Sequence, residues 1–137
     1  MKTKFQNNIF LYLSFLSFIL SLVIPIDLEG LKDFDGFGFI CLIYGWMTFP
    51  DIDFYCWSAN LFIILAWILN KKKLGFVFSL ISFFLMFSYG LDYILHLDIY
   101  GFMDYDQILL AYWFWLLSAT FLLINFIRKF VINKKNS

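Results

Sequence analysis

Asp92 and His96 are the residues whose types and spacing come closest to an acid-base pair or a metal site. They stand four positions apart near the end of a predicted helix, so their side chains share one helix face. His96 is the only histidine of the chain, whereas zinc and copper sites usually combine two or more nitrogen or sulfur ligands. A hydrogen bond between the two side chains is therefore the simpler interpretation.

The sequence also contains three Asp-x-Asp triplets. They are Asp33 with Asp35, Asp51 with Asp53, and Asp104 with Asp106. Triplets of this kind bind a divalent cation together with a nucleotide-sugar in some glycosyltransferases, but those enzymes are much larger than this chain. Capping of the helices that begin beside the second and third triplets is the simpler explanation, because aspartate satisfies the open N–H groups of a first helical turn.

Longer catalytic motifs are absent from the sequence. It contains no nucleophile elbow, P-loop, zinc-protease helix or dinucleotide-binding fingerprint. We therefore predict no catalytic residue, no metal site and no cofactor. The residues that we retain as candidates for binding are Asp51, Asp53, Asn60, Asp92 and His96.

The composition indicates the surroundings in which these residues work. The 137 residues are 63% hydrophobic and 15% charged, whereas soluble globular proteins average about 45–50% apolar and about 25% charged residues. A soluble chain of this length could not bury so much apolar surface. The formal net charge is zero, and no basic patch is available to bind nucleic acid. We therefore expect an all-α integral membrane protein in contact with the lipid bilayer.

Four apolar stretches are long enough to cross that bilayer. They cover about 9–26, 52–69, 74–95 and 108–127. The shortest of them rise roughly 27 Å at about 1.5 Å per residue, close to the thickness of a hydrocarbon core of about 30 Å. The first stretch follows two lysines, as a signal peptide would, but the sequence after Pro25 has no small-x-small cleavage site. We therefore interpret it as an uncleaved span.

The charged residues predict how these spans are oriented. All basic residues except Lys32 lie at the two termini or in the turn at Lys71–Lys73, whereas every acidic residue lies in the two other connections or at the span ends beside them. Basic residues concentrate on the cytoplasmic side of membrane proteins, so we expect both termini in the cytoplasm. Helix dipoles do not explain the pattern, because the first and third spans have basic N-termini and acidic C-termini.

The short apolar segment 37–49 is the remaining element to place. It contains Gly38 and Gly45, and its length is typical of a re-entrant or interfacial helix rather than of a span. If it crossed the membrane, the Lys71–Lys73 turn would lie on the side opposite the N-terminal lysines. We therefore expect a single transmembrane domain over 1–137, with four spans in an antiparallel bundle and this segment between spans one and two.

Polar residues lie near the middle of every predicted span. They are Ser17, Asn60, Ser82 and Ser118, and Ser14 and Ser21 extend the helix face of Ser17. Such residues could line a ligand niche or a pathway, but small hydroxylated residues are also the usual packing surface between membrane helices, and we favour packing. No ionisable side chain lies at this depth, which argues against an ion-coupled pump.

Aromatic residues concentrate where the spans meet the acidic connections. We expect Trp57 and Tyr112 in the headgroup zone on that side and Trp67 in the opposite zone, because a ring with a polar tip suits this layer. Cys41 and Cys56 lie near the acidic side as well. A disulfide between them is geometrically conceivable, but we favour two buried thiols, because we expect Cys56 inside the bilayer.

Three short sequence segments resemble a group of small, uncharacterised bacterial inner-membrane proteins. The segments are Gly45–Trp46, Trp57–Asn60 and Ala66–Leu69. The proteins of that group carry a Gly-Trp pair followed by Trp-x-Ala-Asn at the head of a helix, and often a proline where this chain has Leu61. The resemblance implies a location in the bacterial inner membrane and supplies no catalytic residues.

These features predict a non-catalytic interaction protein. Its partner would be another membrane protein or a second copy of itself, as in a membrane-complex subunit or an immunity-type protein. The alternative is an oligomeric facilitator or channel-like protein in which the mid-span polar residues line a path between protomers. An enzyme that acts on lipid headgroups through Asp92, His96 and the aspartate triplets is a third, less favoured interpretation.

Overall fold

The fold was obtained as a computed structural model that describes residues 4–25, 37–50, 52–95 and 110–135. Within these residues the regular elements are helices: α1 (Lys4–Val23), α3 (Gly38–Tyr44), the 3-10 helix η1 (Gly45–Thr48), α4 (Ile52–Ile68), α5 (Lys73–Leu95) and α6 (Leu110–Lys135). Pro25 and Phe37 form an isolated antiparallel bridge that brings the end of α1 to the start of α3. The predicted all-α class is confirmed.

Two of the helices have the length and composition of membrane spans. They are the segments Lys73–Asp92 of α5 and Leu110–Ile132 of α6. The apolar segments Asn8–Val23 of α1 and Phe54–Ile68 of α4 are shorter, and so is Gly38–Thr48, which covers α3 and η1. The predicted short helical segment at 37–49 is therefore present, and it divides into an α-helical and a 3-10 part.

The helix ends follow from local sequence. α1 ends at Val23, before the predicted limit at 26, because Pro25 has no N–H group and disfavours the helical conformation of the residue that precedes it. α4 ends at Ile68, and a turn stabilised by the bond from the Lys72 N–H to the Leu69 carbonyl leads into α5. This turn contains the exposed lysines predicted there.

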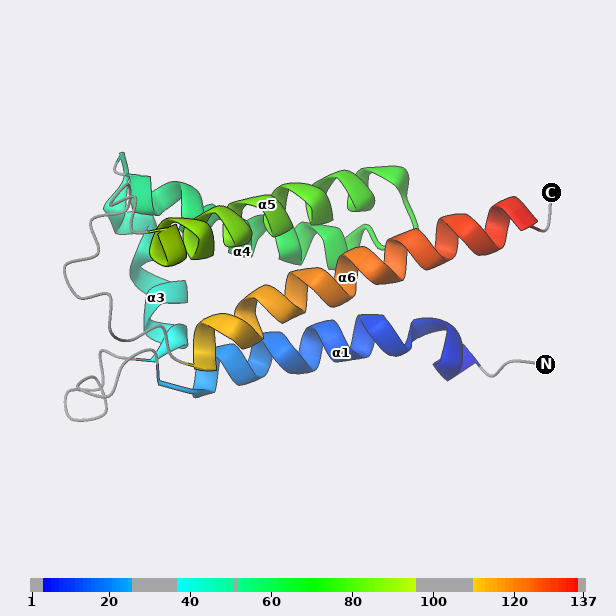
Figure 1. Ribbon diagram of the computed structural model, residues 1–137, viewed down its shortest axis with the longest axis horizontal. Coiled ribbons are helices and arrows are strands. Elements are labelled where there is room, and N and C mark those ends of the chain that lie inside the picture. Colours follow the sequence, from blue (N-terminus) through cyan, green and yellow to red (C-terminus); the bar gives the residue numbers. More distant parts are fainter. Residues whose placement is uncertain (1–3, 26–36, 51, 96–109, 136–137) are drawn as a thin grey trace.

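The most extensive contacts between the long helices are those of α1 with α6, of α4 with α5, and of α5 with α6 (Figure 1). The predicted packing face of α1 is confirmed, because Ser14, Ser17 and Ser21 are all buried. Deep between the helices, the side chains of Ile63 and Leu122 are completely buried. The interior is therefore filled at that level.

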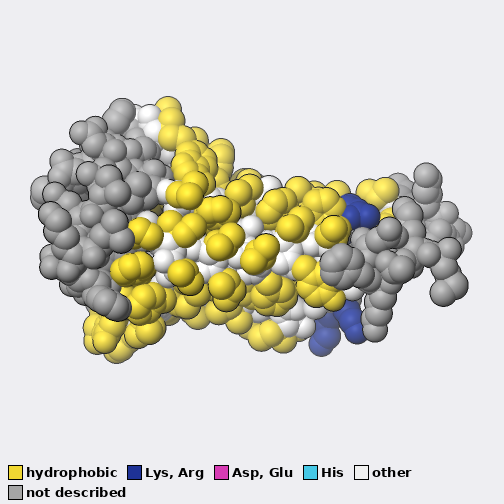
Figure 2. Space-filling view, turned by 90° about the horizontal axis from the view of Figure 1, so that it is seen from below, with side chains coloured by type: hydrophobic (Ala, Val, Ile, Leu, Met, Phe, Trp, Pro, Cys, Tyr) yellow, Lys and Arg dark blue, Asp and Glu magenta, His cyan; other side chains and the backbone are white. Residues whose placement is uncertain are grey.

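The two ends of the molecule differ. The start of α1, the end of α6 and the α4–α5 turn lie together at one end, which we call the basic end, and α3 runs across the opposite end (Figure 1). Lysine and arginine side chains gather near the basic end in Figure 2, and the surface between the two ends is largely apolar. Large exposed apolar side chains on this surface include Leu16 of α1 and Phe84 of α5.

Two expectations about individual side chains are corrected by the structure. Trp67 is buried between helices instead of facing outward: it is 8% exposed, its ring stacks on Phe15 with centroids 4.3 Å apart, and it meets Phe18 edge-on at 5.1 Å. Its position along α4 suggested a headgroup location, but its side chain points toward α1. Cys41 and Cys56 are thiols, as we favoured, but only Cys56 is buried, whereas Cys41 is exposed.

Candidate functional site

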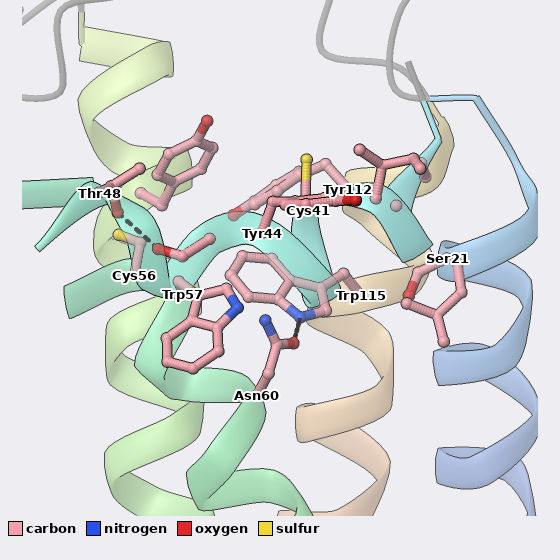
Figure 3. A pocket seen from close by; sticks show the side chains of 15 residues that line it. Ser21, Cys41, Tyr44, Thr48, Cys56, Trp57, Asn60, Tyr112 and Trp115 are labelled. Carbon is pink, nitrogen blue, oxygen red and sulfur yellow. Dashed lines mark hydrogen bonds between the residues drawn. The ribbon is translucent and has the colours of Figure 1, made fainter. Parts of the chain in front are cut away.

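A cavity of about 500 Å³ lies beneath α3, at the end of the molecule opposite the basic end (Figure 3). Residues of α1, α3, η1, α4, α5 and α6 line it. Its volume falls within the range of about 300–1,000 Å³ that is typical of small-molecule sites. The site is therefore built where all the described helices meet.

α3 and η1 form a thin cover over this cavity, and neither contains a buried residue. Two glycines allow the cover to approach the long helices closely. A methyl group at Gly38 would overlap the backbone carbonyl of Ser21 in α1, and one at Gly45 would overlap the indole ring of Trp57 in α4. The glycines that made segment 37–49 look unlike a span thus fix its position over the cavity.

The aromatic walls of the cavity turn their polar atoms into the protein. The indole nitrogen of Trp57 donates to the carbonyl of Leu42 at 3.0 Å, and the hydroxyl of Tyr112 donates to the carbonyl of Met86 at 2.9 Å. The polar atoms of both side chains are therefore bonded within the protein, and their place in the headgroup zone stays a prediction. Both side chains are held by backbone carbonyls of neighbouring elements, which leaves their rings as walls.

Asn60 is the buried polar residue at the bottom of this arrangement. Its Oδ1 accepts a hydrogen bond of 2.7 Å from the indole nitrogen of Trp115, and its side chain is 8% exposed. Because an indole N–H only donates, the atom that meets it must be the amide oxygen, which fixes the orientation of the amide. Figure 3 shows the amide between Trp57 and Trp115 with its nitrogen directed into the space beneath α3.

The Nδ2 group of Asn60 makes no hydrogen bond with any residue that the structure describes. Unlike Nδ2 of Asn125, it is not enclosed by protein atoms on all sides. It is therefore open to the cavity, where water or a ligand can accept its hydrogen bond. Asn60 therefore gives the cavity a hydrogen-bond donor at a defined position.

The rest of the described lining is uncharged. It contains no Asp, Glu, Lys, Arg or His, and it is rich in aromatic side chains. Three of these form a cluster in which the ring of Trp115 lies 6.4 Å from Tyr89 and 6.2 Å from Tyr112, centroid to centroid. Such a lining suits a neutral and largely apolar molecule, and it offers no group with the charge that general acid-base or metal chemistry usually requires.

The candidate binding residues named from the sequence have different outcomes. Asn60 lines the cavity, whereas Asp92 is buried at 1% exposure in α5 and is not among the described residues that line it. Asp51, His96 and the side chain of Asp53 lie outside the described residues, so the Asp92–His96 pair stays a prediction. Within the described part of the chain, no cluster of three or more His, Cys, Asp or Glu residues could hold a metal ion.

The other mid-span polar residues serve helix packing, as we favoured. Ser82 donates to the carbonyl of Ala59 at 3.0 Å and thereby joins α5 to α4. Ser118 donates to the backbone carbonyl of Trp115 within α6 at 2.6 Å. Ser17 is buried on α1. Among the four, only Asn60 contributes to the cavity.

The structure brings together residues that the sequence presented separately. Gly45, Trp57 and Asn60, which belong to the motifs of the resemblance described above, all line the cavity. Trp115 and Tyr89 were not predicted from the sequence. A signal was available for Trp115, which shares a helix face with Tyr112 at a spacing of three.

The chain matches no protein-family model, no curated protein and no solved structure at a significant level. The resemblance to small inner-membrane proteins therefore stays a prediction. The geometry of the cavity and the distribution of charge are the observations on which a function can be argued.

Proposed function

We propose that the chain is a four-span protein of the bacterial inner membrane, with an antiparallel bundle of α1, α4, α5 and α6 and with both termini in the cytoplasm. Its described lysine and arginine side chains gather toward one end of an otherwise largely apolar helical body (Figure 2), as the positive-inside rule requires. α3 would lie in the interface on the outer side. The shorter apolar parts of α1 and α4 would cross with their polar and aromatic flanks in the headgroup zones.

Reporter fusions test this topology directly. Alkaline phosphatase fused after Lys32 or after Gly101 should be active, because both points would lie outside the cytoplasm. Fusions after Lys72 and after Ser137 should be inactive, and a fluorescent protein at these two points should fold and fluoresce. An active phosphatase after Lys72 would overturn the proposed orientation.

We further propose that the protein works by binding and not by catalysis, as a subunit of a membrane complex or as an immunity-type protein. The cavity supports binding over catalysis, because its walls are held by internal hydrogen bonds and its described lining carries no charged side chain. The apolar outer surface of the helices is the observation that carries the protein partner. Its partner would be another membrane protein, which meets the apolar outer surface of the helices. Exposed side chains such as Leu16, Phe84 and Leu117 offer that surface.

Photo-crosslinking in the native membrane tests for such a partner. A photoreactive amino acid at Leu16, Phe84 or Leu117 should capture a specific protein from at least one helix face, since these side chains are exposed. The same amino acid at Ile68 near the basic end provides a fourth exposed position for comparison. Capture of lipid alone at every position would argue against the interaction role.

An oligomeric facilitator is the second candidate, and the closed interior restricts it. Beneath the cavity, Ile63, Met86 and Leu122 are all 0% exposed and fill the space between the helices. A path through one chain would have to displace this core, so transport would need a route between protomers. Liposome flux that does not depend on oligomer formation would rule out this version.

A further inference from the structure

We propose that the cavity beneath α3 is a binding site for a neutral, membrane-soluble molecule with a flat ring that bears a carbonyl oxygen, as in a quinone headgroup. The carbonyl would accept a hydrogen bond from Nδ2 of Asn60. The ring would lie among the aromatic walls. This site is distinct from the apolar outer surface at which a protein partner would bind.

The hydrogen-bonding group at the base of the cavity determines which end of a ligand can bind there. Trp115 holds Oδ1 of Asn60 at 2.7 Å, so the amide cannot turn its oxygen toward the cavity without breaking that bond. The ligand therefore meets a donor and must itself supply an acceptor. A carbonyl oxygen meets this requirement without carrying a charge into an uncharged lining.

The walls determine the shape of the ligand. Trp57 and Tyr112 direct their polar atoms to Leu42 and Met86, so they present ring carbon atoms to a ligand. Aromatic rings favour offset-stacked and edge-to-face contacts with other flat rings. The cavity volume of about 500 Å³ accommodates a bicyclic ring and the first part of a side chain.

A quaternary ammonium ion is the rival ligand, because aromatic cages also bind such cations. The position of the Asn60 amide argues against it. The partial positive charge of the Nδ2 hydrogens points into the cavity and would repel a cation, and the described lining contains no carboxylate to compensate. We therefore infer a neutral acceptor.

Binding of three probes to the purified protein in nanodiscs tests this inference. The probes are dimethylnaphthoquinone, dimethylnaphthalene and phenyltrimethylammonium, which differ in carbonyl groups and charge but share a flat ring. We expect the quinone to bind about 3- to 10-fold more tightly than the hydrocarbon, as one hydrogen bond would give. Equal affinity for quinone and hydrocarbon, or tighter binding of the ammonium probe, would overturn the proposal.

Variants then assign the preference to Asn60. Asn60→Leu should reduce the affinity for the quinone to that for the hydrocarbon, whereas Asn125→Leu should leave both affinities unchanged. Asn125 is a matched control, because it is 2% exposed, its Nδ2 also has no partner in the described structure, and it does not line the cavity. If Asn60→Leu retains the preference for the quinone, the proposal is wrong.

A wall variant keeps the test informative if Asn60→Leu folds poorly. Tyr44 lines the cavity but is 54% exposed, so Tyr44→Ala should preserve the fold. This change should lower the affinities for the quinone and for the hydrocarbon by similar factors, so that the ratio of the two affinities stays unchanged. Unaltered binding of both probes would show that they do not occupy the cavity.

A fourth probe distinguishes between two sources of the ligand, the membrane and the outside of the cell. A naphthoquinone that carries a farnesyl tail should bind more tightly than the tail-less probe if the natural ligand is an isoprenoid quinone of the membrane. A tail that weakens binding points instead to a small aromatic ketone from outside the cell. Because the purified protein is used, failure of this proposal leaves the crosslinking and topology tests of the proposed function unaffected.

Discussion

The indole nitrogen of Trp67 donates a hydrogen bond of 3.0 Å to the hydroxyl oxygen of Ser14. The same hydroxyl donates at 2.7 Å to the backbone carbonyl of Ser118. One serine therefore joins α4 to α1 and α1 to α6, at positions where Ser14 is completely buried and Trp67 is 8% exposed. This link lies in the filled interior below the cavity and holds together helices that are distant in sequence.

Removal of the shared hydroxyl should destabilise the fold. In Ser14→Ala, the Trp67 N–H and the Ser118 carbonyl both lose a partner in a buried place. We expect the free energy of unfolding to fall by about 1 kcal/mol, within the range of up to about 1.7 kcal/mol found for hydrogen bonds between membrane helices. Reversible unfolding in mixed micelles would measure the change.

Ser17→Ala is the control for this prediction. Ser17 belongs to the same face of α1 and is 6% exposed, but it makes no hydrogen bond with the described residues. Its replacement should change the free energy of unfolding much less than Ser14→Ala. Equal losses in the two variants would mean that packing of small residues, and not the hydrogen bonds of Ser14, stabilises this helix contact.

Gly45→Ala should disturb the cover of the cavity. The added methyl group would overlap Cδ1 of Trp57, whose nitrogen is bonded to Leu42, so the indole must move and the bond must lengthen or break. We expect a loss of about 1–3 kcal/mol in the free energy of unfolding, as is usual for overpacking. Thermal unfolding followed by tryptophan fluorescence would report both the stability and the altered surroundings of the ring.

In a Trp57→Leu background, Gly45→Ala should cost less stability, because the smaller leucine side chain leaves room for the added methyl group. Met47→Ala is the control for the cover itself, because Met47 belongs to η1 and is 60% exposed. It should have little effect on stability. If Gly45→Ala is tolerated as well as Met47→Ala, the close contact of η1 with Trp57 is not a feature of the folded protein.

The two thiols should differ strongly in reactivity. Cys41 is exposed on α3 and Cys56 is buried in α4. A membrane-impermeant maleimide added to spheroplasts should label the variant Cys56→Ala, which retains Cys41, and leave the variant Cys41→Ala unlabelled until detergent unfolds it. Labelling of Cys41 from the cytoplasmic side of inverted vesicles would contradict the proposed orientation.

The sequence was sufficient to place two of the long helices, α4 and α5, whereas α6 continues to Lys135, beyond the predicted limit at 127. Predicted spans at 52–69 and 74–95 correspond to α4 at Ile52–Ile68 and α5 at Lys73–Leu95. This agreement has a local cause, because an apolar run bounded by Asn70 and three lysines is a signal that neighbouring residues carry by themselves. The early end of α1 was missed because the apolar run continues past Pro25 although the helix does not.

The cavity could not be predicted, because it depends on how the helices rotate about their axes. Asn60 and Trp115 are 55 residues apart, and hydropathy alone does not indicate that their side chains face each other. The same ambiguity misplaced Trp67. Its position near the end of α4 indicated a depth in the membrane, while the direction of its side chain was set by packing against Phe15 and Phe18.

Gly90 of α5 lies against Tyr112 of α6 beside the cavity. A methyl group at Gly90 would overlap the Tyr112 hydroxyl oxygen, which donates to the carbonyl of Met86. Gly90→Ala should therefore displace the ring and break that bond, with a loss of about 1–3 kcal/mol in the free energy of unfolding. In a Tyr112→Phe background the nearest atom is gone, so the same glycine substitution should cost less.

A double-mutant cycle measures this difference, and a coupling of at least about 0.5 kcal/mol is expected for residues in direct contact. Gly75→Ala provides the control, since a methyl group there would overlap the Leu69 carbonyl and approach Phe126, far along α5 from Tyr112. The loss in free energy of unfolding caused by Gly75→Ala should be the same with Tyr or Phe at position 112, because the effects of substitutions at distant sites are additive. Additive behaviour of Gly90→Ala with Tyr112→Phe would show that α5 and α6 do not meet through these two residues.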